Sequence, residues 1–334
     1  MAFIETVWVD EFYRMRRQNF SFVPGLNSVI GGSMTGKSTL AAALQFVLMG
    51  DEEPRPGFNF NVSVRFAKPD GTHLVFTRYK GSEVDHPEYQ IDFKEASLER
   101  YKEHLRDVGI YTDILQYIVN RTWSDKDWTK ERDAEELAKI VKLSDSRMME
   151  MKENLRELRQ DYRNLKRDLE NGRVINVSLK KLELNDLKRE KSEIAAERSA
   201  HFEMAVLPDF VQTASKNFGI IYRSPDYSLS IKADEDASPM VALSLTLHTS
   251  ETQISIEPSP GEFVRVNLAL FFTLIQKRSA SVIIFDELED KVHCDDLLKL
   301  AQGIQFFGAH FQIIVLCRDF PDQVGPQKIL RYTF

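Results

Sequence analysis

The sequence predicts an α/β protein in which two β-rich lobes flank a helical insertion. Three observations lead to this prediction. A glycine-rich loop follows an apolar run near the amino end, another apolar run ending in two carboxylates lies near the carboxyl end, and a stretch with almost no glycine or proline separates them. We therefore divide the chain into an amino-terminal lobe at 1–145, a helical segment at 146–204 and a carboxyl-terminal lobe at 205–334.

Composition limits the class of protein. Of 334 residues, 43% are hydrophobic and 28% charged, which suits a globular chain with one large core or two lobes. The two cysteines, Cys294 and Cys317, exclude a disulfide framework and favour a reducing, intracellular environment. We expect a soluble protein, because the charged amino terminus is unlike a signal peptide and no apolar run approaches the roughly 18 residues of a membrane span. The net charge of −7 gives no general attraction to nucleic acid.

The amino-terminal lobe combines short β-rich runs, such as SVRF and LVFTRY, with a turn signal at Pro69–Thr72. Its basic residues suggest a local face for weak, non-specific DNA binding, with a solvated charged edge as the open alternative. The residues of this predicted basic face are Arg14, Arg16, Arg17, Arg65, Lys68, Arg78 and Lys80.

The helical segment predicts a short antiparallel coiled coil. Apolar residues recur at alternating spacings of three and four along its first arm, which is typical of a heptad seam. They are Met148, Met151, Leu155, Leu158, Tyr162, Leu165 and Leu169. After a break at Asn171–Ser178 a second arm carries Leu184, Leu187 and Ile194, and we expect Lys191 and Arg198 to spoil its register. Each arm of roughly 24 residues would extend about 36 Å.

The amino-terminal glycine-rich loop matches the phosphate-binding pattern G-x-x-x-x-G-K-[ST]. It lies between the apolar run LNSVI and the helical pattern TLAAALQFVLM, so strand, loop and helix follow in the order that phosphate binding requires. We expect Lys37 to reach the β- and γ-phosphates of ATP and Ser38 to offer its hydroxyl to Mg²⁺. The predicted nucleotide-binding residues of this loop are Gly31, Gly32, Ser33, Met34, Thr35, Gly36, Lys37, Ser38 and Thr39.

The carboxyl-terminal run SVIIFDE completes a nucleotide site of this kind. A buried strand that ends in two carboxylates is typical of a Walker B motif. We expect Asp286 to bind Mg²⁺ through water and Glu287 to polarise the attacking water as the catalytic base. The absence of an Asn-Lys-x-Asp guanine reader disfavours a GTPase, and a small-molecule kinase would not need the helical insertion.

This order of parts resembles the head of a structural-maintenance-of-chromosomes (SMC) ATPase over nearly the whole chain. The segments that carry the resemblance are FIETVWVDEFYRMRRQNFSFVPGLNSVIGGSMTGKST, YQIDFKEASLERYKEHLRDVGI, GEFVRVNLALFFTLIQ and FQIIVLCRDFPDQVGPQKILRYTF. The last of these resembles the condensin branch of the family. The resemblance implies an ABC-ATPase-like P-loop head built from both lobes, with the coiled coil inserted. The helical segment leaves no sequence for a hinge, so we expect a naturally short, hinge-less SMC-like protein rather than a head trimmed and rejoined with a Gly/Ser linker.

The segment that resembles the SMC signature departs from the family pattern. The family sequence, roughly Leu-Ser-Gly-Gly-Glu, clamps the γ-phosphate held by an opposite head. The corresponding residues are Pro258, Ser259, Pro260, Gly261 and Glu262. Ser259 and Gly261 keep the nucleotide-contacting types, but Pro260 has no N–H to donate and a fixed φ.

The Q-loop and D-loop depart as well. The family glutamine falls on Arg121, beside Asn120, and Gln116 would serve only if the loop were five residues shorter. Val292-His293 stands where the D-loop has Leu-Asp, and Cys317 at the switch position favours neither outcome. Because phosphoryl transfer depends on positioned donors, two or three such losses predict ATP binding with weak or absent hydrolysis.

Two functions remain open. The first is an ATP·Mg²⁺-bound head that docks on condensin-type SMC heads or their accessory subunits and modulates, by our expectation antagonises, chromosome condensation. The second is an active ATPase head working with a partner head in chromosome organisation or DNA repair. Both place the protein in the nucleus, associated with chromosomes.

Overall fold

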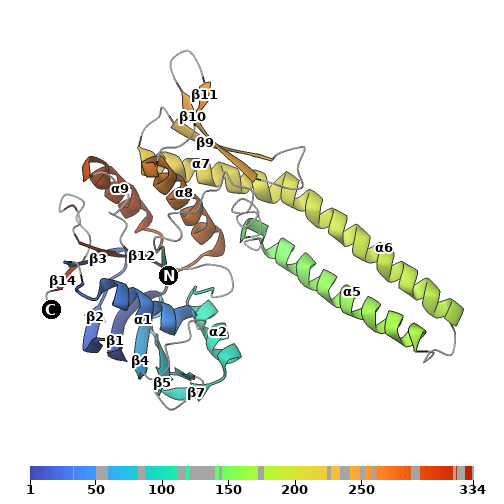
Figure 1. Ribbon diagram of the computed structural model, residues 1–334, viewed down its shortest axis with the longest axis horizontal. Helices are drawn as coiled ribbons and strands as arrows, with labels where there is room; N and C mark the ends of the chain where they lie inside the picture. The colour runs from blue at the N-terminus through green and yellow to red at the C-terminus, as the bar shows by residue number, and fades with distance from the viewer. Residues whose placement is uncertain are drawn as a thin grey trace.

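The computed structural model describes residues 1–32, 34–49, 59–81, 87–111, 118–119, 140–142, 145–171, 177–223, 227–233, 241–248, 253–256, 260–286, 294–318, 321 and 328–332. Its described part is a mixed α/β head from which a two-helix hairpin projects (Figure 1). None of the helices in these ranges is long and apolar enough to cross a membrane.

Six strands of the amino-terminal lobe form an antiparallel sheet. Their spatial order is β2 (Met15–Ser21), β1 (Phe3–Phe12), β4 (Phe60–Ala67), β5 (His73–Lys80), β6 (Glu88–Ile91) and β7 (Lys94–Ala96). The predicted turn at Pro69–Thr72 lies between β4 and β5. In it, Asp70 accepts hydrogen bonds from the Thr72 hydroxyl and amide, and these bonds lower the pKa of Asp70.

A second sheet is entirely parallel and draws strands from both lobes. Its order is β14 (Lys328–Tyr332), β3 (Leu26–Gly31), β13 (Gln312–Cys317), β12 (Val282–Asp286) and β8 (Ile118–Val119). The interior of β12 and all of β13 are buried, as expected for strands covered on both faces. The two lobes therefore share one sheet.

One buried side chain ties the two sheets together. Gln312, at the start of β13, accepts a hydrogen bond from the amide of Ile4 in β1 and donates to the carbonyls of Ile4 and Val23. Its side chain is fully buried, and its amide oxygen and nitrogen are both satisfied by backbone groups.

Helix α1 (Lys37–Met49) contacts strands of both sheets. Apolar side chains surround its axis, among them Leu40, Leu44, Phe46 and Val47, and all four are buried. A helix that is apolar on every side belongs in a protein interior. Helix α2 (Leu98–Asp107) begins at the N-cap Ser97, whose hydroxyl accepts from the amide of Arg100.

The carboxyl-terminal lobe places helices α8 (Pro260–Arg278) and α9 (Cys294–Phe307) beside the parallel sheet, and α7 (Leu207–Tyr222) packs on both helices (Figure 1). Phe272 of α8 stacks on Phe307 and Phe311 and meets Phe285 of β12 edge-on. A third sheet of three antiparallel strands lies next to α7. Its order is β11 (Gln253–Ile256), β10 (Val241–His248) and β9 (Tyr227–Ala233).

The hairpin consists of α5 (Ser146–Glu170) and α6 (Val177–His201), which pack side by side (Figure 1). Each has 25 residues, about 37 Å at the usual rise. At its base Asp145 caps α5 by accepting from the amide of Met148 and contacts His201, while Arg147 pairs with Glu197. A π-helical turn, η1 (Phe202–Val206), then joins α6 to α7.

The second arm keeps a regular seam, contrary to the expectation that Lys191 and Arg198 spoil its register. Its half-buried positions alternate four and three residues apart and are Lys180, Leu184, Leu187, Lys191, Ile194, Arg198 and His201. Lys191 and Arg198 therefore occupy the seam rather than interrupt it. Long basic side chains can do so because their apolar stems pack while the charged ends reach outward, and the Lys191 ammonium lies 5.1 Å from the centre of the Tyr162 ring.

Candidate nucleotide-binding site

The site is built at the carboxyl edge of the parallel sheet, where ligands of open α/β sheets bind. Ile30 of β3 pairs with Cys317 of β13, and Asp286 of β12 pairs with Leu316. Since all the strands of this sheet run in one direction, Gly31, Cys317 and Asp286 end at the same edge. The sequence predicted both motifs; the sheet order brings them within two strand spacings, about 10 Å.

The glycine-rich loop links β3 to α1 in a compact turn. Gly36 has φ 83°, in the left-handed region that glycine adopts without strain, and its carbonyl accepts from the amide of Leu40 in the first turn of α1. Met34 also has a left-handed φ, 65°, and its side chain is 96% exposed. Thr35 closes the turn by donating from its hydroxyl to the Gly32 carbonyl at 2.9 Å.

Lys37 is held over this loop. Its side chain is only 8% exposed, and its ammonium donates to the carbonyls of Gly31 at 2.6 Å and Gly32 at 2.7 Å. An ammonium has three N–H bonds, so these two contacts fix its position and leave a third for an incoming acceptor. A buried cation fixed by the loop backbone is suited to an anionic ligand.

The amino end of α1 adds to this positive field. Ser38 is exposed and Thr39 half-buried in the first turn, which contains no acidic residue. The unpaired N–H groups of a helix amino terminus carry a partial positive charge, so the loop, Lys37 and this turn favour the same kind of ligand. A phosphate chain fits that chemistry.

Asp286 supplies a carboxylate to the same edge. It is half-buried at the end of β12. On its other side β8 ends at Val119, which pairs with Phe285, the residue before Asp286. Several predicted residues lie outside the described ranges: Ser33, Gln116, Asn120, Arg121, Pro258, Ser259, Glu287, Val292 and His293.

The signature-like segment enters the described part of the chain at the first turn of α8, which includes Gly261. In that turn Glu262 accepts from the hydroxyl of Tyr222, the last residue of α7, at 3.1 Å. The guanidinium of Arg265 lies 4.7 Å from the centre of the Tyr222 ring. The start of α8 is thus anchored to the helix that continues from the hairpin.

Two residues of the predicted basic face do not lie on the surface, so the prediction is wrong for them. Arg78 and Lys80 are buried, with 1% and 9% of their surfaces exposed. Both share the face of β5 that holds Leu74 and Phe76, and α1 contacts this strand. Because both faces of β5 are largely buried, alternation along this strand gave no signal that would have assigned Arg78 to the core.

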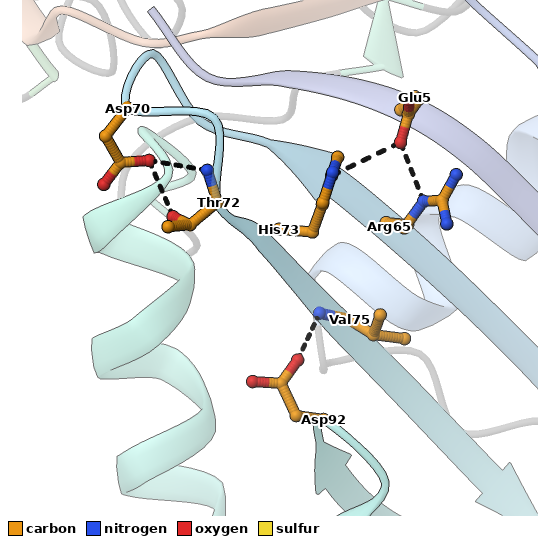
Figure 2. Close-up of polar contacts among 7 residues, drawn as sticks. All are labelled: Glu5, Arg65, Asp70, Thr72, His73, Val75 and Asp92. Atoms are coloured by element: carbon orange, nitrogen blue, oxygen red, sulfur yellow. Dashed lines mark hydrogen bonds and ion pairs between the residues drawn. The ribbon is translucent and has the colours of Figure 1, made fainter.

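A third member of that face, Arg65, is engaged by an acidic neighbour. Its guanidinium contacts Glu5 at 2.7 Å, and His73 contacts the same carboxylate at 3.4 Å (Figure 2). Arg16 likewise pairs with Glu11 at 3.1 Å, whereas Arg14 and Arg17 are exposed. The predicted basic face is therefore reduced to Arg14 and Arg17 near the turn between β1 and β2, and to the half-buried Lys68 just after β4.

Two polar residues from other elements contact the carboxyl end of α1, and the sequence did not lead us to connect either with the site. Arg78 donates to the Phe46 carbonyl at 2.6 Å, and Tyr101 of α2 donates to the Val47 carbonyl at 2.8 Å. Tyr101 is fully buried, and this burial raises the pKa of its phenol. Both bonds satisfy carbonyls of the last turn of α1.

Comparisons with known proteins agree with this arrangement. A family model described as AAA domain matches residues 11–201, and no curated protein sequence matches the chain. An SMC head domain with an extended coiled coil, from Pyrococcus furiosus and bound to the C-terminal domain of ScpA, has a TM-score of 0.62 at 18% identity, with 97% of this chain and 91% of that chain covered.

Two further structures give the same result. An SMC head bound to the C-winged helix domain of ScpA has a TM-score of 0.68 at 17% identity, covering 99% of this chain and 95% of that one. An SMC head with a coiled coil and joint from Pyrococcus yayanosii has a TM-score of 0.61 at 15% identity, covering 100% and 95%. The predicted ABC-ATPase-like head with an inserted coiled coil is thereby confirmed. The chain belongs to the AAA domain family and has the fold of an SMC head.

Proposed function

We propose that this protein is an SMC-like head that binds ATP with Mg²⁺, hydrolyses it slowly, and docks on condensin-type SMC heads or their accessory subunits to modulate them. The observation that carries the nucleotide part is the buried Lys37 ammonium, fixed by the carbonyls of Gly31 and Gly32 at the edge that also ends in Asp286.

The residues at this edge fit ATP·Mg²⁺. Backbone amides of Gly31–Thr39 and the Lys37 ammonium would hold the phosphates. The exposed Ser38 hydroxyl and the Asp286 carboxylate are hard oxygen donors, which Mg²⁺ prefers. When bound, the metal ion would neutralise phosphate charge, while this chain's own groups orient the nucleotide.

Slow hydrolysis follows from the sequence departures. Glu287 keeps the base, but Pro258, Pro260 and Arg121 replace groups that the resemblance assigns to the composite two-head site. Removal of one preorganised donor costs about 10²–10³ in rate. A head so altered would retain nucleotide much longer than an active ATPase.

Docking is supported by the similarity of this fold to SMC heads that are bound to another protein. Two of the similar structures are SMC heads bound to parts of ScpA, and we propose that this chain also contacts an accessory subunit or a second head. We expect it to compete with a full-length SMC protein and so antagonise condensation, which would place it on chromosomes in the nucleus.

The experiment combines nucleotide titration with steady-state ATPase measurements, alone and with a condensin-type SMC head. We expect tight Mg²⁺-dependent ATP binding, little turnover in either sample, and a complex with the partner head by size-exclusion chromatography. Turnover that appears only with the partner would favour the alternative, an active ATPase head in chromosome organisation or repair. Absence of ATP binding would reject both.

A further inference from the structure

We propose that Arg78 is a positioning residue of the nucleotide site, and that it acts through α1 by means of its charge. The inference rests on the proposed ATP binding. The contact of Arg78 that carries the inference, its hydrogen bond to the Phe46 carbonyl, lies at the opposite end of the helix whose first turn forms the phosphate-binding site.

Arg78 contacts the carboxyl end of α1 and two aromatic rings. Its guanidinium donates to the Phe46 carbonyl at 2.6 Å, lies 4.3 Å from the centre of the Phe46 ring, and lies 5.2 Å from that of Tyr89 in β6. At 1% exposure it is among the largest fully buried side chains of the described residues. Two aromatic faces and a helix-end carbonyl together restrict its position.

The charge of Arg78 matters because it lies at the negative end of the α1 dipole. The last turn of α1 contains no basic residue of its own, so a cation supplied by β5 compensates the partial negative charge of the final carbonyls. Dipole effects fall off within a terminal turn, so the charge of Arg78 acts on a phosphate at the amino end by direct Coulomb attraction. Phe46 lies nine residues beyond Lys37, about 13.5 Å along the axis, and anchoring to the rigid α1 keeps that separation fixed.

Tyr101 provides an internal comparison. Its hydroxyl bonds the next carbonyl, that of Val47, at 2.8 Å, and it is also fully buried. Both residues therefore donate a hydrogen bond to the same end of α1, but Arg78 alone of the two carries a charge. If α1 only needs anchoring, loss of either should have the same effect on nucleotide binding.

The test measures dissociation constants of fluorescent ATP and ADP, and the thermal midpoint, for four variants of the full chain. Arg78→Met removes charge and donor, Arg78→Gln removes the charge but keeps a donor for the Phe46 carbonyl, Arg78→Lys keeps the charge, and Tyr101→Phe removes the second anchor. We expect Arg78→Met and Arg78→Gln to weaken ATP binding about tenfold and ADP less, because the effect scales with phosphate charge. Arg78→Lys should stay within about threefold of the original chain, and Tyr101→Phe within about twofold despite a lower thermal midpoint.

The proposal is overturned if Arg78→Gln binds ATP as tightly as the original chain, or if Tyr101→Phe weakens ATP as much as Arg78→Gln. Arg78→Gln decides the matter even if Arg78→Met does not fold, since it keeps a polar N–H donor and part of the volume. Failure of the unaltered chain to bind ATP would overturn the proposed function together with this inference. Tight binding by the unaltered chain and by both neutral variants would overturn the inference alone.

Discussion

Lys37 illustrates how much of the candidate site is decided by single residues. Its ammonium is fixed by two carbonyls of its own loop before any ligand arrives. Holding a cation in place in advance reduces the ordering that binding must bring about. The substitutions at this edge should therefore affect nucleotide binding far more than folding.

We expect Lys37→Ala to abolish measurable ATP binding, because it removes the cation that faces the β- and γ-phosphates. Asp286→Asn should weaken only the Mg²⁺-dependent part of the affinity, since it removes a charge from the metal's side of the site. Calorimetric titration with and without Mg²⁺ measures both. Lys216→Ala on the exposed face of α7 is the matched control, and equal affinity in Lys37→Ala and Lys216→Ala would reject the assignment of the loop.

Gly109 gives a stability prediction at the same scale. It has φ 80°, and a Cβ there would lie 3.0 Å from both the Cβ and the backbone nitrogen of Ser281. That contact joins the end of the α2 region to the start of β12, where Ser281 donates from its amide to the Gly109 carbonyl. Left-handed strain and overpacking together should make Gly109→Ala cost about 3 kcal/mol of unfolding free energy.

Gly71 separates these two causes. It has the same φ of 80°, but nothing lies within 4 Å of an added Cβ. Gly71→Ala should cost only about 1 kcal/mol in urea denaturation, from backbone strain alone. Similar losses in the two variants would show that the close approach to Ser281 contributes nothing.

At the scale of elements, the hairpin joins an apolar arm to an arm with cations in its seam. Met148, Met151 and Leu155 are buried on α5, opposite an α6 seam that includes Lys191 and Arg198. Burial and, secondarily, the nearby Arg159 lower the pKa of Arg198. The seam is thus held by stems and ring contacts as well as by aliphatic packing.

We expect Lys191→Leu to stabilise the hairpin by about 0.5–1 kcal/mol, because an apolar side chain in the seam needs no hydration. Lys188→Leu, at an exposed position of the same helix, should change stability by less than about 0.3 kcal/mol. The thermal midpoint and the helical circular dichroism signal report both. A loss of stability in Lys191→Leu would mean that the ammonium contact with Tyr162 outweighs apolar packing.

The β1–β2 turn holds most of what remains of the predicted DNA-binding face. Arg78 and Lys80 are in the core, and Arg65 and Arg16 pair with carboxylates. Arg14 and Arg17 stay exposed near this turn, and the half-buried Lys68 lies just after β4. We expect weak, sequence-independent DNA binding. The slope of its affinity against salt concentration should correspond to no more than about three phosphate contacts. Fluorescence anisotropy with a duplex between about 50 and 200 mM salt measures this slope. A steeper slope, or one unaffected by Arg14→Ala with Arg17→Ala, would place the contact on another surface.

The elements also show where sequence reasoning succeeds. The loop after β3 and the strand ending at Asp286 could be predicted, because each consists of contiguous residues whose conformation is local. The seam of α5 could be predicted from its period. Burial of Arg78 could not be inferred without knowing that α1 covers β5, and the place of Lys191 in the seam depends on a partner helix that accommodates its stem.

At the scale of the whole molecule, the parallel sheet makes the two lobes one body. β3 and β8 come from the first lobe and β12, β13 and β14 from the second, so the candidate site forms only when both ends of the chain pair. The pairs Leu26–Ile313 and Ile118–Ile284 join residues 287 and 166 positions apart, and pairing over such separations leaves no local sequence signal. The helical path from α6 through η1 to α7 then meets the first turn of α8 at Tyr222 and Glu262.

The turnover prediction belongs to this scale because it concerns two heads. If the departures in the signature-like segment and Q-loop explain slow hydrolysis, Pro258→Leu, Pro260→Gly and Arg121→Gln together should restore donors around the γ-phosphate. We expect the rate measured with a partner head to rise by about one order of magnitude or more. ATP affinity, which depends on the loop and Lys37, should change little.

Glu287→Gln distinguishes a supported base from an idle one. In the original chain it should alter the rate little, because a base contributes only when water and phosphate are held in line. In the restored chain the same substitution should abolish the recovered activity. If the original chain with a partner head instead turns over ATP at about 1 s⁻¹ or faster, and loses that rate in Glu287→Gln, then the departures do not impair the composite site. The protein would in that case work as an active ATPase head, and its partner would supply the contacts that Pro258 and Pro260 lack.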